Sequence, residues 1–210
     1  MRRGYALLIA GGDLVDIGVE EFNGYALKIA VDAGAEVFKK LGIVPDILVG
    51  DMDSIDHETL EFFRKKGCSV CEYSHEKDEL DLELAILEAL KVNPVEIHIY
   101  GSWGSRPDQT LAAYRLLKRY SDHSILLMNR DWEVFLLSSS SSFNAFPGQI
   151  WSFLAACDVV RGLSLKGFKY PLNSYDLHFH ETFTLSNEAV NSKVEVIFES
   201  GELFVFRERR

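Results

Sequence analysis

The 210-residue chain lacks the features that mark secreted, membrane-spanning and nucleic-acid-binding proteins. It has only three cysteines, an odd number, which suits a reducing cytoplasm better than a disulfide framework. No stretch approaches the roughly 20 consecutive apolar residues of a membrane span. Basic residues are too few to offset the acidic ones, and the formal net charge of −10 argues against a broad basic surface for nucleic acids or anionic membranes. We therefore expect a cytoplasmic protein with no nucleic-acid or membrane partner.

Several common binding motifs are also absent. The sequence has no phosphate-binding loop of the GxxxxGK type and no GxGxxG dinucleotide fingerprint. Cys68 and Cys71 have no second ligand pair at zinc-site spacing, so ordinary packing is expected rather than a metal or redox role. His178 and His180 are expected to be exposed strand residues rather than a metal pair. The apolar run near the N-terminus is short and ends in two glycines, which favours a buried first strand over a signal peptide.

The first part of the chain alternates strand-like and helix-like segments. Apolar runs predict strands at 5–11, 26–32, 46–50, 69–74, 96–102 and 124–129. Helical periodicity predicts helices at 34–42, 57–67, 79–92 and 108–120. This alternation is typical of βαβ units, so residues 1–131 are expected to form an α/β domain with a mostly parallel sheet.

Helical periodicity disappears past Asp131. The runs 132–138, 149–156, 163–168, 178–186, 193–199 and 202–208 are short, aromatic and β-branched. They predict an antiparallel β-sandwich or small barrel over residues 132–210. Glu199–Glu202 is expected to be a hairpin turn, and the serine run Ser138–Ser142 a linker or a loop after a strand.

Two aspartates directly follow a predicted buried strand. Asp51 and Asp53 are two residues apart, so in extended chain their side chains project to the same side. Clustered carboxylates repel each other unless a cation neutralises them, and hard oxygen ligands suit Mg²⁺ with phosphate completing the shell. The alternative is a solvated acidic loop in which Ser54 or Asp53 caps a helix starting at Ile55.

A second acidic pair lies at the start of a predicted helix. Asp78 and Asp81 are three residues apart, which would place them on one face of that helix. The alternative is that they only complement the helix dipole from the first turn.

Two further segments lie at strand-to-helix junctions. Arg106 precedes Pro107 and is well placed to grip phosphate, whereas Asp108 is also ordinary helix-start chemistry. Asp32 and Gly34 open a helix whose small residues let a phosphate or ribose approach the backbone N–H groups. Together the motifs predict a Mg²⁺-dependent enzyme acting on a phosphorylated small molecule. Two alternatives remain: a phosphatase with Asp51 as nucleophile, and a non-catalytic nucleotide-binding regulator.

Taken in order, five segments resemble the motif series of the thiamine pyrophosphokinases. They are VDAGAEVFKKLGIVPDILVGDMDSI (31–55), KDELDLELAI (77–86), GSRPDQTLA (104–112), GFKYPL (167–172) and LSNE (185–188). The GDxDS block and the order of the series are specific, whereas each of the other segments alone is not. The resemblance implies the following roles: Mg²⁺-ATP ligands Asp51, Asp53 and Asp81, with Asp78 adjacent; a nucleotide-contacting turn at Asp32 and Gly34; a phosphate- and substrate-side block at Arg106, Asp108 and Gln109; and a thiamine-side pair, Ser186 and Asn187.

The same resemblance implies a fold and a reaction. The fold is an α/β nucleotide domain followed by a β-sandwich, in a homodimer with its active sites at the interface. The reaction is transfer of pyrophosphate from ATP to thiamine, with Mg²⁺ as cofactor, AMP as the second product and Asp108 as one candidate to accept or orient the hydroxyl proton. A related diphosphokinase acting on another alcohol, such as a pterin, is the nearest rival.

The chain departs from the family pattern at four positions. The family usually has glycine where this chain has Ala33 and Ser105, asparagine where it has Glu36 and threonine where it has Leu80. None of these departures removes a carboxylate. They leave the expected reaction type unchanged and bear on the shape of the nucleotide loop and on the acceptor.

Overall fold

The computed structural model describes residues 4–12, 17–53, 55–74, 76 and 78–209. The chain divides into two compact units, Met1–Arg130 and Asp131–Arg210, called here the N-terminal unit and the C-terminal unit.

The N-terminal unit is built on a parallel sheet. Its strands are β1 (Tyr5–Ile9), β2 (Leu27–Val31), β3 (Ile47–Gly50), β4 (Ser69–Glu72), β5 (Glu96–Tyr100) and β6 (Ile125–Met128). They lie in the order β6-β5-β1-β2-β3-β4, and every neighbouring pair is parallel. Central strands of such a sheet are covered on both faces, which explains why Leu7, Leu8 and Ile9 are all fully buried.

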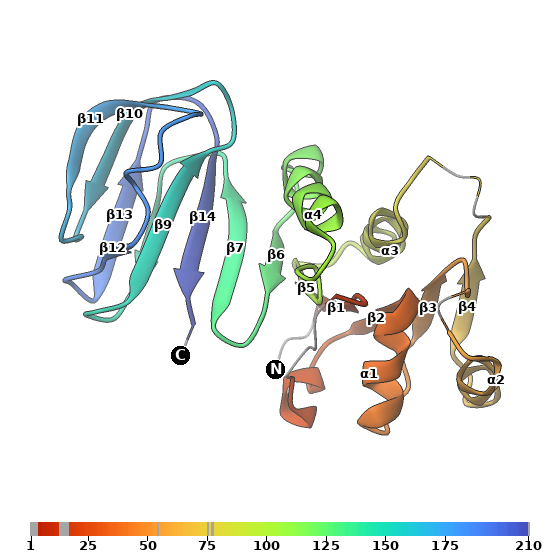
Figure 1. Cartoon of the computed structure of the whole chain (residues 1–210). Coiled ribbons are helices and arrows are strands. Elements are labelled where there is room, and N and C mark those ends of the chain that lie inside the picture. The colour runs from red at the N-terminus through yellow and green to blue at the C-terminus, as the bar shows by residue number, and fades with distance from the viewer. Residues whose placement is uncertain (1–3, 13–16, 54, 75, 77, 210) are drawn as a thin grey trace. The chain divides into compact units, whose positions relative to one another are not determined.

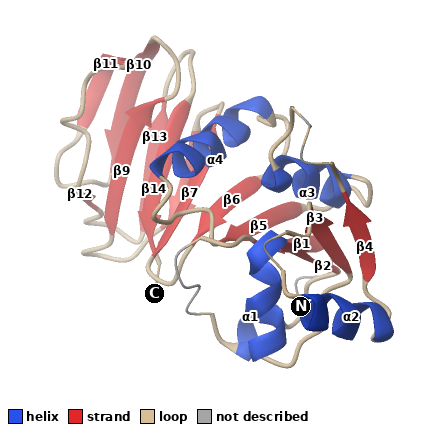
Figure 2. Ribbon diagram, turned by 45° about the vertical axis from the view of Figure 1, so that its right-hand side comes forward, coloured by secondary structure: helices blue, strands red, loops and turns tan. Residues whose placement is uncertain are grey.

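Helices cover both faces of this sheet. They are α1 (Ala35–Lys40), α2 (His57–Lys65), α3 (Asp81–Leu90) and α4 (Pro107–Arg119), with two short 3-10 turns, η1 (Val19–Phe22) and η2 (Asp32–Gly34). Within the unit, α1 and α2 lie on one face, and α3 and α4 lie on the other (Figures 1 and 2). None of the helices in the described part of the chain is long and apolar enough to cross a membrane.

The C-terminal unit consists of two antiparallel sheets. Its strands are β7 (Trp132–Leu137), β8 (Ser141–Asn144), β9 (Ile150–Ala155), β10 (Val159–Lys166), β11 (Leu172–His178), β12 (Asn187–Glu188), β13 (Lys193–Ile197) and β14 (Leu203–Glu208). One sheet has the order β12-β9-β14-β7 and the other the order β11-β10-β13-β8. Their buried side chains form a core rich in aromatic residues, in which Trp151 packs edge-on against Phe168 with ring centroids 5.8 Å apart.

The expected fold class is confirmed: a mostly parallel α/β part is followed by antiparallel sheets. Three details of the second half were predicted wrongly. Glu199–Glu202 is not a hairpin turn, because β13 and β14 belong to different sheets. The run 178–186 is not a strand, since β11 ends at His178 and turns follow. Two residues of the serine run, Ser141 and Ser142, lie in β8, where pairing with β13 outweighs their low strand propensity.

Candidate active site

A pocket lies at the carboxyl ends of the strands of the N-terminal unit. Strands β2 to β4 extend from β1 to one side and β5 and β6 to the other, so β1 and β5 flank the point where the strand order reverses. Ligands of such sheets bind in the crevice at this point. The pocket has a volume of about 200 Å³. It is lined by Ala10, Gly11, Gly12, Val31, Asp32, Ala33, Leu80, Asp81, Leu82, Gly101, Ser102 and Gln109.

Glycines allow the strand ends to approach each other closely here. The Gly12 N–H donates to the Gly101 carbonyl over 2.9 Å, and a Cβ on Gly12 would lie 2.3 Å from that oxygen. A Cβ on Gly34 would lie 1.9 Å from the carbonyl oxygen of Ile9. Any residue with a Cβ atom would clash at these two positions, so the close packing of the backbone around the pocket requires glycine there. Gly34 itself supports the floor and does not line the pocket.

Asp32 is fixed at the end of β2 in a strained conformation. Its φ of 46° is in the left-handed region, and a Cβ on Gly50 would lie 1.7 Å from its Oδ1 atom. The missing side chain of Gly50 thus makes room for the Asp32 carboxylate at the end of β3, next to Asp51. A non-glycine residue in this backbone region is uncommon, and such strain gathers at functional sites.

Asp51 and Asp53 form a tight turn after β3. The Asp53 N–H donates to Asp51 Oδ1 over 3.0 Å, and between them Met52 has a φ of 65° and is 9% exposed. Asp56 caps α2, accepting from the Thr59 N–H over 2.9 Å, so the alternative that Asp53 caps this helix is wrong. Ser54, the other cap considered, lies outside the described residues.

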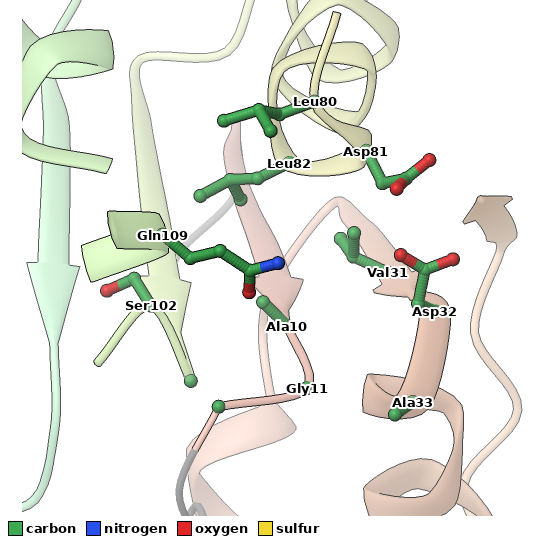
Figure 3. A pocket seen from close by; sticks show the side chains of 12 residues that line it. Ala10, Gly11, Val31, Asp32, Ala33, Leu80, Asp81, Leu82, Ser102 and Gln109 are labelled. Atoms are coloured by element: carbon green, nitrogen blue, oxygen red, sulfur yellow. The ribbon is translucent and has the colours of Figure 1, made fainter. Parts of the chain in front are cut away.

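The second acidic pair is split by the start of α3. Asp81 is the first residue of the helix, is half-buried and lines the pocket. Asp78 lies before the helix and is exposed, so the expectation that both share one helix face is wrong. Figure 3 shows the Asp81 and Asp32 carboxylates on the same side of the pocket, with the Gln109 carboxamide reaching in from α4.

Within the described ranges there is no group of three or more His, Cys, Asp or Glu side chains close enough to hold a metal ion. Asp51 and Asp53 share one turn, whereas Asp81 comes from a separate helix start. Mg²⁺ is commonly held by one or two carboxylates together with substrate phosphates and water. The donor types present fit that mode of binding.

Arg106 and Asp108 are paired with each other at the start of α4. The Arg106 Nε and a terminal nitrogen donate to the two Asp108 carboxylate oxygens over 2.9 and 2.6 Å. This guanidinium lowers the pKa of the Asp108 carboxyl to about 2. While this ion pair is intact, Asp108 is a poor proton acceptor, and the Arg106 guanidinium is bound to Asp108 and not to a phosphate. Both side chains are more than half exposed, at 65% and 63%, so breaking this ion pair to bind another group costs little free energy.

Ser186 and Asn187 lie in the C-terminal unit, at the start of β12. Ser186 is exposed, has a φ of 56° and donates its N–H to Ser152 Oγ over 2.9 Å. Asn187 is 3% exposed and bonds through its side chain to the backbone of Tyr170. The pair thus has one exposed member and one buried member.

The four departures from the family pattern have different surroundings. Ala33 and Leu80 line the pocket, the latter 40% exposed. Glu36 lies away from the pocket lining, with Oε1 3.3 Å from the Thr59 hydroxyl of α2. Ser105 is exposed in the loop before α4.

Among the residues that the structure describes, neither the cysteines nor the two histidines belong to a group of three or more potential metal ligands. All three cysteines are free thiols, and burial raises the pKa of Cys68 to about 11, which makes it a poor nucleophile. The rings of His178 and His180 stack with centroids 5.8 Å apart, at the end of β11 and in the turn after it.

Several pocket residues were not singled out from the sequence, namely Gly11, Gly12, Leu82, Gly101 and Ser102. A glycine at the end of an apolar, strand-like run was the available signal for Gly11 and Gly101. The sequence held no signal for Leu82 or Ser102, because a leucine in a helix and a serine after a strand-like run are common in any protein.

Comparison with known proteins decides the family. The model of the thiamin pyrophosphokinase catalytic domain matches residues 20–128, and that of the thiamin pyrophosphokinase vitamin B1 binding domain matches residues 140–203. The chain belongs to the thiamin pyrophosphokinase family. The resemblance read from the ordered motifs is thereby confirmed.

Individual members of the family match along nearly the whole chain. The thiamine pyrophosphokinase of Bacillus subtilis (strain 168) is 29% identical over 213 residues, which cover 95% of this chain and 96% of that protein. The crystal structure of the thiamine pyrophosphokinase from Bacillus subtilis has a TM-score of 0.88 at 28% identity, covering 97% of this chain and 98% of that one. The structure of a thiamin pyrophosphokinase family protein from Enterococcus faecalis has a TM-score of 0.86 at 25% identity, covering 98% of this chain and 99% of that one.

Proposed function

We propose that this protein is a thiamine pyrophosphokinase, which transfers pyrophosphate from ATP to the hydroxyethyl oxygen of thiamine and releases AMP. The match of both family models, one on each unit, carries this proposal. Neither a phosphatase using the Asp51 turn nor a pterin diphosphokinase finds support in these matches.

Each unit is assigned one substrate. Residues 1–131 form the domain for ATP and metal, and residues 132–210 form the domain for thiamine. The pocket at the β1 and β5 ends supports the first assignment, since this is where α/β sheets bind nucleotides. At about 200 Å³ it is smaller than the roughly 300–1,000 Å³ typical of small-molecule pockets, so only part of ATP would fit inside it.

Asp51, Asp53 and Asp81 would hold Mg²⁺, and Asp32, Gly34, Asp78 and Gln109 would form the surroundings of the nucleotide. Bound Mg²⁺ would neutralise charge on the phosphates as the bridging oxygen leaves. The Asp53 N–H bond to Asp51 fixes the geometry of the turn before any ligand binds. Asp81 at the start of α3 faces the same pocket as Gln109.

Arg106 and Asp108 would act in sequence. Two oxygens of a phosphate group offer Arg106 the same bidentate geometry as the Asp108 carboxylate does. Exchange of Arg106 onto phosphate would remove the cation that keeps the Asp108 pKa low. Asp108 would then be a better acceptor for the proton of the thiamine hydroxyl.

The proposed assembly is a cytoplasmic homodimer with its active sites at the interface. Large apolar side chains of the C-terminal unit are exposed to solvent, among them Phe179 at 67%, Phe183 at 56% and Leu185 at 44%. Exposed apolar groups close in sequence favour an interaction surface. Sedimentation of wild-type protein as a dimer and of Phe179→Ser/Phe183→Ser as a monomer would support this, with Val92→Ser, 58% exposed on the N-terminal unit, as control.

Labelled ATP tests the reaction. With ATP labelled at the γ-phosphate, Mg²⁺ and thiamine, the label is expected at the terminal phosphate of thiamine diphosphate, and the nucleotide product is AMP. Chelation of the metal should abolish turnover and added Mg²⁺ should restore it. Formation of ADP together with thiamine monophosphate would instead identify an ordinary kinase and contradict the proposal.

A further inference from the structure

Asn187 is committed to hydrogen bonds inside the protein. Its Oδ1 accepts from the Tyr170 N–H over 3.0 Å and from the Glu188 N–H over 2.9 Å, and its Nδ2 donates to the Tyr170 carbonyl over 2.8 Å. An amide oxygen has two lone pairs, and both are used here. At 3% exposure, Asn187 presents almost no surface to a substrate.

Tyr170 shows the opposite arrangement. Its backbone N–H and carbonyl are both held by the one buried side chain, while the residue is 62% exposed. The preceding residues fix the same loop: Phe168 is in the core, and the Lys169 N–H donates to the Glu188 carbonyl over 2.8 Å. The loop is therefore anchored before the exposed ring and at the residue that carries it.

The Tyr170 ring already faces a cation. The Lys169 ammonium lies 5.9 Å from the ring centroid and 3.1 Å from a Glu188 carboxylate oxygen. Tyrosine faces attract cations through the ring quadrupole. A flat cationic heterocycle could replace the Lys169 ammonium over this face. The displaced ammonium would stay paired with the Glu188 carboxylate.

We infer that Asn187 is a positioning residue, which acts on thiamine through Tyr170 by holding its exposed ring where the flat, cationic thiazolium stacks. This inference rests on the proposed function, and it differs from direct contact between Asn187 and the substrate. Direct contact would require access to an amide that is 3% exposed, whereas the ring belongs to a residue that is already 62% exposed.

A double-mutant cycle tests the inference. Tyr170→Ala is expected to raise KM for thiamine about tenfold, and Tyr170→Phe, which keeps the ring, less than about twofold. Asn187→Ala and the near-isosteric Asn187→Asp should raise KM for thiamine several-fold and leave KM for ATP unchanged. Because Asn187 acts through Tyr170, the KM for thiamine of the Tyr170→Ala/Asn187→Ala protein should lie within about twofold of that of Tyr170→Ala. Asn191→Ala, an exposed asparagine close in sequence, is the control and should match wild type.

Two results would overturn the inference: additive effects in the double variant, or no effect of Tyr170→Ala on KM for thiamine. Should Asn187→Ala fail to fold, the Tyr170 amide in wild-type protein provides a second measurement. Slow hydrogen exchange at this amide is expected from its bond to a buried oxygen, and fast exchange would contradict the link. A wild-type protein that makes no thiamine diphosphate would refute the proposed function instead, and the exchange measurement would still stand.

Discussion

The contact between Gly11 and Ala33 predicts a coupled pair of substitutions on the pocket floor. A Cβ on Gly11 would lie 2.8 Å from the Ala33 Cβ, closer than real Cβ contacts, and 3.5 and 3.6 Å from the Ala33 Cα and carbonyl carbon, which are ordinary distances. Only the Ala33 methyl therefore opposes a methyl at position 11. Gly11→Ala is expected to lower the free energy of unfolding by about 1–3 kcal/mol, the usual cost of overpacking.

The second substitution should rescue the first. Ala33→Gly alone should cost about 0.5–1 kcal/mol through backbone entropy. In the double variant the clash is gone, so its cost should stay near that of Ala33→Gly, giving a coupling energy of about 1–3 kcal/mol. Urea unfolding followed by far-ultraviolet circular dichroism measures this, because helices α1 to α4 all belong to the N-terminal unit.

A matched control separates this contact from general sensitivity of the floor. A Cβ on Gly12 would lie 2.3 Å from the backbone oxygens of Gly101 and Trp103, atoms that Ala33→Gly does not move. Gly12→Ala should therefore stay destabilised when combined with Ala33→Gly. Costs for Gly11→Ala and Ala33→Gly that add within about 0.5 kcal/mol would refute the packing argument.

Three further predictions follow from individual contacts. Asp53→Asn should lower kcat/KM at least about 100-fold at saturating Mg²⁺ without lowering the unfolding midpoint, and near-wild-type turnover would contradict its role. Hydrogen bonds from the Thr59 hydroxyl and N–H lower the pKa of Asp56 from 3.8 to about 2, so its stabilisation is present above pH 3.8 and is lost as the pH falls toward 2. Asp56→Asn should flatten that part of the acid unfolding curve, and identical curves would contradict this. Arg207→Met should cost the C-terminal unit about 2–4 kcal/mol in urea unfolding, since it leaves Glu133, 10% exposed, without the guanidinium that also lies 5.2 Å from the Trp151 ring. A loss below about 0.5 kcal/mol would refute this estimate, and Arg207→Lys, which keeps the charge, should lose less.

The alternation of segments was sufficient to predict the N-terminal unit. Its strands are apolar runs bounded by turn residues, and each helix carries its own periodicity, so local sequence and final structure agree. In the C-terminal unit local sequence was less informative, because strand pairing there joins distant segments. β13 and β14 follow each other closely yet belong to different sheets, and β8 contains serines that pair with β13. Such pairings depend on tertiary context more than on propensity.

The candidate site was predictable in its residue types and less so in its geometry. The structure brings Asp32, Asp81 and Gln109 to one pocket, as expected for residues at the carboxyl ends of parallel strands and at helix starts. The pairing of Arg106 with Asp108 was not foreseen, because residues two apart do not face each other inside a helix. It forms because Arg106 is the N-cap, with extended backbone angles, while Asp108 is already helical.

Backbone strain distinguishes the motif positions in a way that sequence patterns do not show. Among the described non-glycine residues, five have positive φ, and three of these lie in the motifs: Asp32, Met52 and Ser186. Glycine would adopt these angles more readily, so the side chains at these positions are kept at a cost of the order of 1 kcal/mol each. Asp32 keeps a carboxylate at the end of β2, and Met52 buries a side chain that anchors the turn between two carboxylates. Strain at both turns thus accompanies carboxylates placed at the ends of two neighbouring parallel strands, where a straight continuation of either strand would carry them away from the sheet edge.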